Sequence, residues 1–115
     1  MKFQELNERV ILWAQEKGIL EKATSLTQIN KTFEEVEETK DALFAKVNRL
    51  DYFTNSKGHI CNTESEIIDG FGDILVTILI GCKMQDIDPL HALETALFVI
   101  ESRTGKMKNG TFVKD

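Results

Sequence analysis

The sequence predicts an all-α protein, a four-helix bundle completed by oligomerisation. Three observations support this prediction. Apolar residues recur at intervals of three and four along most of the 115 residues. The chain has a single proline, so little interrupts the helices. Start and end signals separate the periodic stretches. The length predicts one domain, residues 1–115.

Two helices are predicted in the amino-terminal half. The first runs from about Lys2 to Lys17, and Gly18 is placed to end it. The second runs from about Thr27 to Tyr52. It carries a near-heptad apolar stripe made of Leu26, Ile29, Phe33, Val36, Leu43, Val47 and Leu50. This stripe predicts packing against another helix.

A turn at residues 55–58 leads to a third predicted helix. Thr63-x-x-Glu66 has the capping-box form that starts a helix. This helix extends to about Lys83, and from Ile74 onward it is apolar on nearly every side. Such a pattern is typical of a helix that is buried all round.

A fourth helix is predicted to begin with Asp88 as N-cap and Pro89 at its first position. Gly105 marks its end. Its expected core face consists of Leu93, Ala96, Leu97 and Ile100. Residues 106–115 lack a period and are expected to form a non-helical C-terminal tail.

Composition narrows the class of function. The net charge of -5 argues against a nucleic-acid polymer as partner, because phosphate binding needs a basic face. Two cysteines outside any C-x-x-C pattern are typical of a reduced protein. The first residues have no apolar signal-peptide core, and the longest apolar stretch, Ile74 to Cys82, is far short of a membrane span. We therefore expect a cytoplasmic protein without a membrane partner.

The third predicted helix carries an acidic stripe. Glu66, Asp69 and Asp73 stand at i, i+3 and i+7, within an arc of roughly 60°. The same side continues with Val76, Thr77, Ile80 and Met84, so the carboxylates are expected to face protein. Two of these carboxylates also have ordinary explanations. Glu66 can be the capping-box partner of Thr63, and Asp69 can interact with the positive end of the helix dipole. Asp73 lies more than two turns into the helix, where neither explanation holds.

The second predicted helix supplies Glu34, Glu35 and Glu38. A run of this kind is usually a solvated helix face. However, the same side continues as Ala42 and Ala45, which would let another helix approach. Crowded carboxylates resist ionising unless a cation offsets their charge. Ligands that are all oxygens favour Mg²⁺, with Mn²⁺ as a substitute.

These motifs resemble the MazG-like, all-α nucleoside triphosphate pyrophosphohydrolases. The match consists of Glu34-Glu35-x-x-Glu38, then Glu66-x-x-Asp69, then Gly72-Asp73-Ile74-Leu75. Trp13 and the ending from Arg103 to Asp115 resemble the compact phage- and mobile-element-associated branch. One departure concerns the E-x-x-D motif, whose aspartate directly follows a glycine in many family members. If Asp73 is aligned with that aspartate, Gly70 stands at the position of the family's glutamate. The choice between Glu66 with Asp69 and Asp73 as ligands therefore stays open.

The resemblance implies Mg²⁺-dependent hydrolysis of a nucleoside triphosphate to the monophosphate and pyrophosphate. It implies Glu35, Glu38, Glu66 and Asp69 as metal ligands, with Asp73 a further or outer ligand. Glu34 is the candidate for orienting or deprotonating the attacking water, and Glu35 could exchange roles with it. Nucleotide-pool housekeeping is the role that the family suggests.

Further residues are candidates for binding the substrate. Basic side chains for the phosphates are Lys57, Arg103, Lys106 and Lys114. Trp13 could stack on a base or pack in the core, and Asn109 could read a base edge or form a turn with Gly110. The apolar third helix predicts a homodimer or homotetramer. The alternatives are a non-catalytic helical interaction module and a dUTPase-like enzyme of the same fold.

Overall fold

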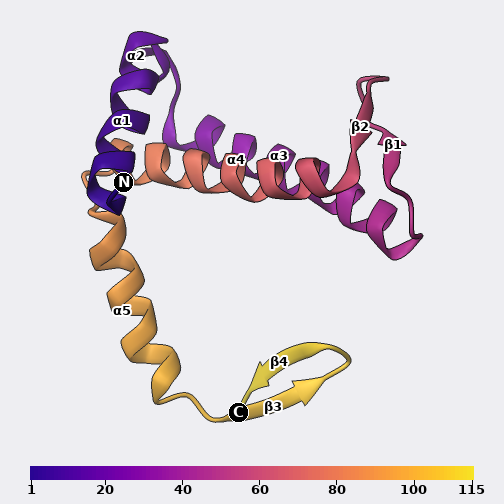
Figure 1. Cartoon of the computed structure of the whole chain (residues 1–115). Helices are drawn as coiled ribbons and strands as arrows, with labels where there is room; N and C mark the ends of the chain where they lie inside the picture. The colour runs from indigo at the N-terminus through magenta and orange to yellow at the C-terminus, as the bar shows by residue number, and fades with distance from the viewer.

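The computed structural model describes residues 1–115 and contains five helices and two β-hairpins (Figure 1). The elements are α1 (Phe3–Glu16), α2 (Ile19–Lys22), α3 (Ser25–Val47), β1 (Tyr52–Thr54), β2 (Ile60–Asn62), α4 (Thr63–Met84), α5 (Pro89–Glu101), β3 (Gly105–Lys108) and β4 (Thr111–Lys114). Helices hold 66% of the residues, which confirms a mostly helical fold. The two hairpins correct the all-α prediction, and α2 raises the number of helices from four to five.

The centre of the structure is the antiparallel pair of α3 and α4 (Figure 1). At one end of the pair, Gln28 Nε2 donates a hydrogen bond to the Thr77 carbonyl oxygen at 3.2 Å. At the other end, Lys46 Nζ lies 2.9 Å from a Glu64 carboxylate oxygen. Between them Gly70 faces Thr39 so closely that an added Cβ would lie 3.0 Å from the Thr39 Cβ. A glycine here allows the two helix backbones to approach.

Helix α3 ends five residues earlier than predicted. Arg49 adopts a left-handed conformation with φ 59°, and the Leu50 N–H donates to the Ala45 carbonyl at 2.9 Å. Such a left-handed residue with backbone bonds to the last turn is a common way to end a helix. Tyr52 therefore belongs to β1, which pairs with β2 in register Tyr52↔Asn62. The prediction that the helix continues to Tyr52 was wrong because the apolar period of α3 continues into a strand of aromatic and β-branched residues.

The predicted turn at residues 55–58 is the tip of the β1–β2 hairpin. Asn55 Oδ1 accepts hydrogen bonds from the N–H groups of Lys57 and His59, at 3.0 and 2.9 Å. Helix α4 then starts at Thr63, but the cap is Asn62, whose side chain accepts from the Ser65 N–H at 3.0 Å. The predicted Thr63 capping box is therefore wrong. Thr63 Oγ1 instead donates to the Leu50 carbonyl at 2.7 Å and so joins the start of α4 to the segment between α3 and β1.

The first and last helices flank the pair differently. Helix α1 packs against α4 and buries Ala14 completely. Helix α5 begins as predicted, with Asp88 Oδ1 accepting from the Leu90 N–H at 3.0 Å and Pro89 at the first turn. It ends at Glu101, before Gly105, and leads away from the pair to the hairpin β3–β4 (Figure 1).

The single chain is too open to be a four-helix bundle. Its radius of gyration is 16.8 Å, against about 13 Å for a compact domain of about 100 residues. Leu75 and Ile78 on α4 are exposed, so that helix is not buried all round. The expected core face of α5, Leu93, Ala96, Leu97 and Ile100, is also exposed. The predicted apolar stripe of α3, from Leu26 to Leu50, is exposed as well, so the prediction that it packs against another helix is wrong within one chain. The residues that α3 buries are Gln28, Glu35, Thr39, Ala42 and Ala45. None of the helices has the length and apolar composition required to cross a membrane.

Candidate metal centre

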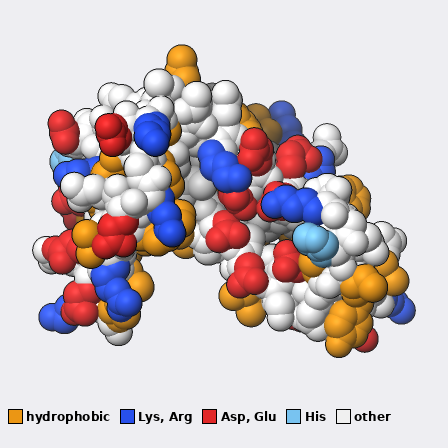
Figure 2. All heavy atoms as spheres, turned by 90° about the horizontal axis from the view of Figure 1, so that it is seen from above, with side chains coloured by type: hydrophobic (Ala, Val, Ile, Leu, Met, Phe, Trp, Pro, Cys, Tyr) orange, Lys and Arg blue, Asp and Glu red, His pale blue; other side chains and the backbone are white.

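The pairing of α3 with α4 brings the two acidic segments together. Glu35 and Glu38 on α3 interact electrostatically with Asp73 on α4, and Asp69 lies one turn from Asp73. We call these four residues the acidic cluster. Figure 2 shows Asp and Glu side chains gathered around a hollowed part of one face, with Lys and Arg among them. Residues about 35 positions apart in the sequence thus share one electrostatic environment.

Glu35 is the buried member of the acidic cluster. It is only 9% exposed. Burial raises the pKa of its carboxyl, and the charges of Glu38 and Asp73 raise it further. Lys31 acts in the opposite direction, with its Nζ 3.5 Å from Glu35 Oε1. The environment therefore disfavours the ionised form of Glu35 and would favour a bound cation.

Asp73 shows the same behaviour from the facing helix. Partial burial raises its pKa, followed by the charges of Asp69 and Glu38, while Lys31 lowers it. The mutual influence of Glu38 and Asp73 means that α3 and α4 contribute to a single site. Asp73 thus interacts with both glutamates of α3, whereas Asp69 acts on Asp73 along its own helix. Both aspartates are exposed, so the prediction that they face protein is wrong within one chain.

Glu66 lies at the other end of the site, toward the β1–β2 hairpin. It lines a small cavity of about 30 Å³ with Glu38 and with Phe53, Asn55, Ser56 and Lys57 of the hairpin. The turn therefore brings Lys57, predicted as a phosphate contact, next to two carboxylates. Burial and then Glu66 raise the pKa of the neighbouring Cys61 thiol, to which Asn55 Nδ2 donates at 3.4 Å. The sequence interpretation missed Asn55 and Cys61, because it treated residues 55–58 only as a turn.

Glu34 is not part of the acidic cluster. Its side chain is 64% exposed and its Oε2 lies 3.1 Å from Lys31 Nζ. The hydrogen bond to Glu34 is the main cause of the raised pKa of Lys31. Lys31 was missed at the sequence level, although its i, i+3 and i, i+4 spacing to Glu34 and Glu35 was visible. It is the one cation that contacts the acidic cluster directly.

The chemistry of the donor set fits a hard divalent cation. All candidate ligands are carboxylate oxygens, and burial and neighbouring charges raise the pKa of two of them, Glu35 and Asp73. A bound cation would favour the ionised form of both. No three side chains of His, Cys, Asp or Glu converge enough to hold a metal ion on their own. That geometry is compatible with Mg²⁺, which usually takes one or two carboxylates and completes its shell with water and substrate phosphates.

The other predicted substrate contacts lie away from the acidic cluster. Trp13 is 46% exposed on α1. Arg103, Lys106, Asn109 and Lys114 belong to the carboxy-terminal segment, whose side chains are all exposed from His91 onward. Asn109 has φ 50° and Gly110 φ 80°, which is the geometry of a two-residue hairpin turn. Asn109 therefore has a structural role in joining β3 to β4.

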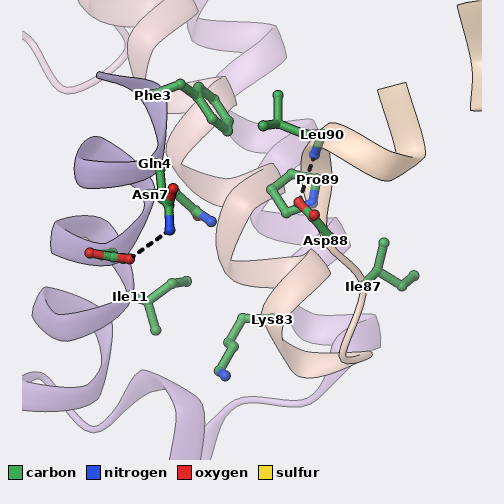
Figure 3. Close-up of a pocket in the computed structure, with 10 residues that line it drawn as sticks. Phe3, Gln4, Asn7, Ile11, Lys83, Ile87, Asp88, Pro89 and Leu90 are labelled. Carbon is green, nitrogen blue, oxygen red and sulfur yellow. Dashed lines mark hydrogen bonds between the residues drawn. The ribbon is translucent and has the colours of Figure 1, made fainter. Parts of the chain in front are cut away.

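A larger cavity, of about 390 Å³, lies elsewhere, where α1 meets the junction of α4 and α5 (Figure 3). Its acidic side chains are already engaged, since Gln4 Nε2 donates to Glu8 at 3.3 Å and Asp88 caps α5. The buried Asn7 Oδ1 has no hydrogen-bond partner. This cavity contains no residue of the acidic cluster, so it offers no comparable set of metal ligands.

Comparisons of the chain with protein-family models, with curated proteins and with solved structures gave no match. The assignment of a function therefore depends on the geometry and chemistry of the acidic cluster.

Proposed function

We propose that this protein is a Mg²⁺-dependent hydrolase that converts (deoxy)nucleoside triphosphates to the monophosphate and pyrophosphate, as its resemblance to the MazG-like enzymes implies. The observation that carries the proposal is the pairing of Glu35 and Glu38 with Asp69 and Asp73 across two helices. Their mutual repulsion and partial burial raise the pKa of Glu35 and Asp73. A site with these properties is suited to a cation that in turn binds phosphates.

In this proposal one or two carboxylates would hold the metal, and water and substrate phosphates would complete its shell. The candidate ligands are Glu35, Glu38, Glu66, Asp69 and Asp73, with Lys57 beside Glu66 at the entrance. Mn²⁺ could replace Mg²⁺. When bound, the ion would neutralise phosphate charge and lower the pKa of a coordinated water. An acidic protein needs such an ion, because its own carboxylates would otherwise repel a triphosphate.

The reaction that we propose is hydrolysis at the α-phosphorus. The oxygen of a water forms a bond to that phosphorus, and the bond to the α–β bridging oxygen breaks. Pyrophosphate leaves with the bonding electron pair, and the proton of the water passes to a carboxylate. The burial of Glu35 and its raised pKa support Glu35 as the proton acceptor. Glu34, which is exposed and paired with Lys31, is the weaker candidate and would act by keeping Lys31 in place.

We also propose that the active form is a homodimer or homotetramer. Leu75 and Ile78 on α4 and Leu97 and Phe98 on α5 are all at least 42% exposed. Large apolar side chains that a single chain leaves exposed on two helices would be covered in an interface. The same observation favours one alternative from another class, a helical interaction module without catalysis.

The test is the release of pyrophosphate from a panel of canonical and damaged nucleoside triphosphates. We expect release with Mg²⁺ or Mn²⁺ and none with EDTA. Comparing kcat/KM over the panel also separates a general enzyme from a dUTPase-like one. If no nucleotide is turned over while the protein is folded, the enzyme proposal is wrong and the interaction module is favoured.

A further inference from the structure

The carboxy-terminal segment from Pro89 to Lys114, comprising α5, β3 and β4, forms an arm that begins beside α1 and leads away from the α3–α4 pair (Figure 1). Every side chain from His91 to Asp115 is exposed. The arm nevertheless carries large apolar side chains on both helix and hairpin, namely Leu90, Leu93, Leu97, Phe98, Val99, Ile100, Met107, Phe112 and Val113. A segment of this composition does not stay solvated in a stable protein without a covering surface.

The hairpin at the end of the arm has one basic face. Lys106 pairs with Val113 and Lys108 with Thr111, so both lysines point to the same side of the two-stranded sheet. Met107 and Phe112 pair on the opposite side. From Arg103 to Lys114 the sequence contains four basic residues and no acidic one. This contrasts with the overall charge of -5 of the chain.

The acidic cluster lacks the positive charge that a triphosphate site needs. Within one chain only Lys31 and Lys57 lie beside its carboxylates. Lys31 is already engaged by Glu34 and Glu35, at 3.1 and 3.5 Å. The chain thus holds an acidic site short of phosphate contacts and a basic hairpin without a partner. The two surfaces are complementary in charge.

We propose that the β3–β4 hairpin of one copy lies against the acidic cluster of a second copy, where Lys106 and Lys108 bind the phosphates of the substrate. This inference rests on the proposed function. A second copy is the favoured occupant because α5, about 20 Å long, leads the hairpin away from α4 (Figure 1). Two copies related by a twofold axis would exchange arms and cover the apolar faces of both α5 helices at once. If the arm instead folded back onto the acidic cluster of its own chain, we would expect Leu93 and Phe98 to stay uncovered.

The first experiment is complementation between two impaired variants, assayed at a substrate concentration below the KM of the wild type. One variant is Glu38→Gln, which disables the acidic site, and the other is Lys106→Ala with Lys108→Ala, which disables the hairpin. Mixed in equal amounts and allowed to exchange subunits, they should recover about a quarter of the wild-type activity. Half of the dimers are then mixed, and each mixed dimer has one intact site made from both chains. No recovery, with exchange demonstrated by differently labelled chains, would mean that the hairpin acts within its own chain.

The matched control for the lysine variant is Lys17→Ala with Lys22→Ala. These lysines are exposed near the α1–α2 junction, outside the cluster and the hairpin. We expect wild-type activity from this control and at least a tenfold loss of kcat/KM, mainly through KM, from the hairpin variant. Equal activity of the two variants would overturn the phosphate-binding role of Lys106 and Lys108.

Chemical crosslinking tests the placement of the hairpin without catalysis. One chain carries Cys82→Ser and keeps Cys61, which lies beside Glu66 in the site. The other carries Cys61→Ser, Cys82→Ser and Lys108→Cys. A short bismaleimide should join the two chains only when both are present. If wild type releases no pyrophosphate but this crosslink forms, the proposed function is wrong and the exchange of arms stands. If pyrophosphate is released and no crosslink forms, the arm proposal is wrong.

Discussion

The α3–α4 pair and the C-terminal arm differ in what their side chains contact. In the pair, polar groups are matched across the helices, as where Gln28 reaches the Thr77 backbone and Thr32 Oγ1 donates to Thr77 Oγ1 at 2.8 Å. In the arm, helix and hairpin are well formed but every side chain beyond Leu90 is exposed. Local signals are therefore enough to form the elements of the arm, whereas its burial depends on a surface that this chain does not provide.

The same contrast applies to charge. The pair gathers carboxylates around the buried Glu35, and Lys31 is the cation that contacts Glu35 directly. The hairpin concentrates lysines on one exposed face. Each region carries the charge that the other lacks, so variants of either region should show whether the two work together.

The largest expected effect comes from removing a carboxylate of the pair. Asp73→Asn should lower kcat/KM for pyrophosphate release at least about 100-fold, since even outer partners of a metal contribute about 10- to 100-fold. Glu64→Gln is the control, because Glu64 lies on the same helix but pairs with Lys46 outside the cluster. Steady-state kinetics on both variants make the comparison. Retention of activity by Asp73→Asn would leave Glu66 and Asp69 as the α4 ligands.

The next effect concerns how closely α3 and α4 approach. In Gly70→Ala the new Cβ would meet the Thr39 side chain, and overpacking of this kind costs about 1–3 kcal/mol of stability. Gly72→Ala places its Cβ in open space and should stabilise α4 by up to about 1 kcal/mol. Chemical denaturation of both variants measures the difference. If both alanines have the same effect, the close contact of Gly70 with Thr39 is wrong.

A smaller effect is expected from the arm, on the self-association of the protein. Phe98 is 74% exposed in the single chain, so Phe98→Ser should leave the fold of one chain intact. It should weaken self-association about tenfold or more, because an apolar side chain at an interface is lost. Light scattering over a dilution series would detect the change. An unchanged dissociation constant would argue that α5 does not form the interface.

The smallest effect is a dependence of stability on pH. Because the pKa of Glu35 is raised in the folded state, the folded protein binds a proton more strongly than the unfolded chain does. The stability of the metal-free protein should therefore fall as the pH rises from the ordinary carboxyl range through the raised pKa. Glu35→Gln should remove part of that fall, and Mg²⁺ should offset it at pH 7. Thermal melts in EDTA and in Mg²⁺ test this, and identical pH profiles for wild type and Glu35→Gln would contradict it.

Sequence patterns predicted the helices well where local signals set their ends. Asp88 and Pro89 start α5 as expected, because N-cap chemistry acts within a few residues. The end of α3 was wrong because apolar spacing continues through Leu50, while the left-handed Arg49 that ends the helix has no signal in its residue type. Strands β3 and β4 were missed because their alternation of lysine with apolar residues is short, although Asn109-Gly110 is a typical hairpin turn.

The acidic site was predictable for a different reason. The spacing of the acidic residues on two helices predicted that they meet, and Glu35 and Glu38 do interact electrostatically with Asp73. Only Glu35 is buried, however, whereas Glu38, Asp69 and Asp73 are exposed. Periodicity could not separate Glu34 from Glu35, because adjacent residues on a helix differ by only about 100° in direction. The burial of Glu35 and the exposure of Glu34 depend on where α4 lies, which is a tertiary property.

The most direct test of the account is pyrophosphate release by Glu38→Gln and Glu37→Gln, measured side by side with wild type in Mg²⁺ and in EDTA. Glu37 is an exposed neighbour on α3 that takes no part in the acidic cluster. We expect wild type and Glu37→Gln to be equally active with Mg²⁺ and inactive in EDTA, and Glu38→Gln to be at least about 100-fold less active while melting at the same temperature. Equal activity of the two variants, or release that persists in EDTA, would contradict a metal-dependent site formed by α3 and α4.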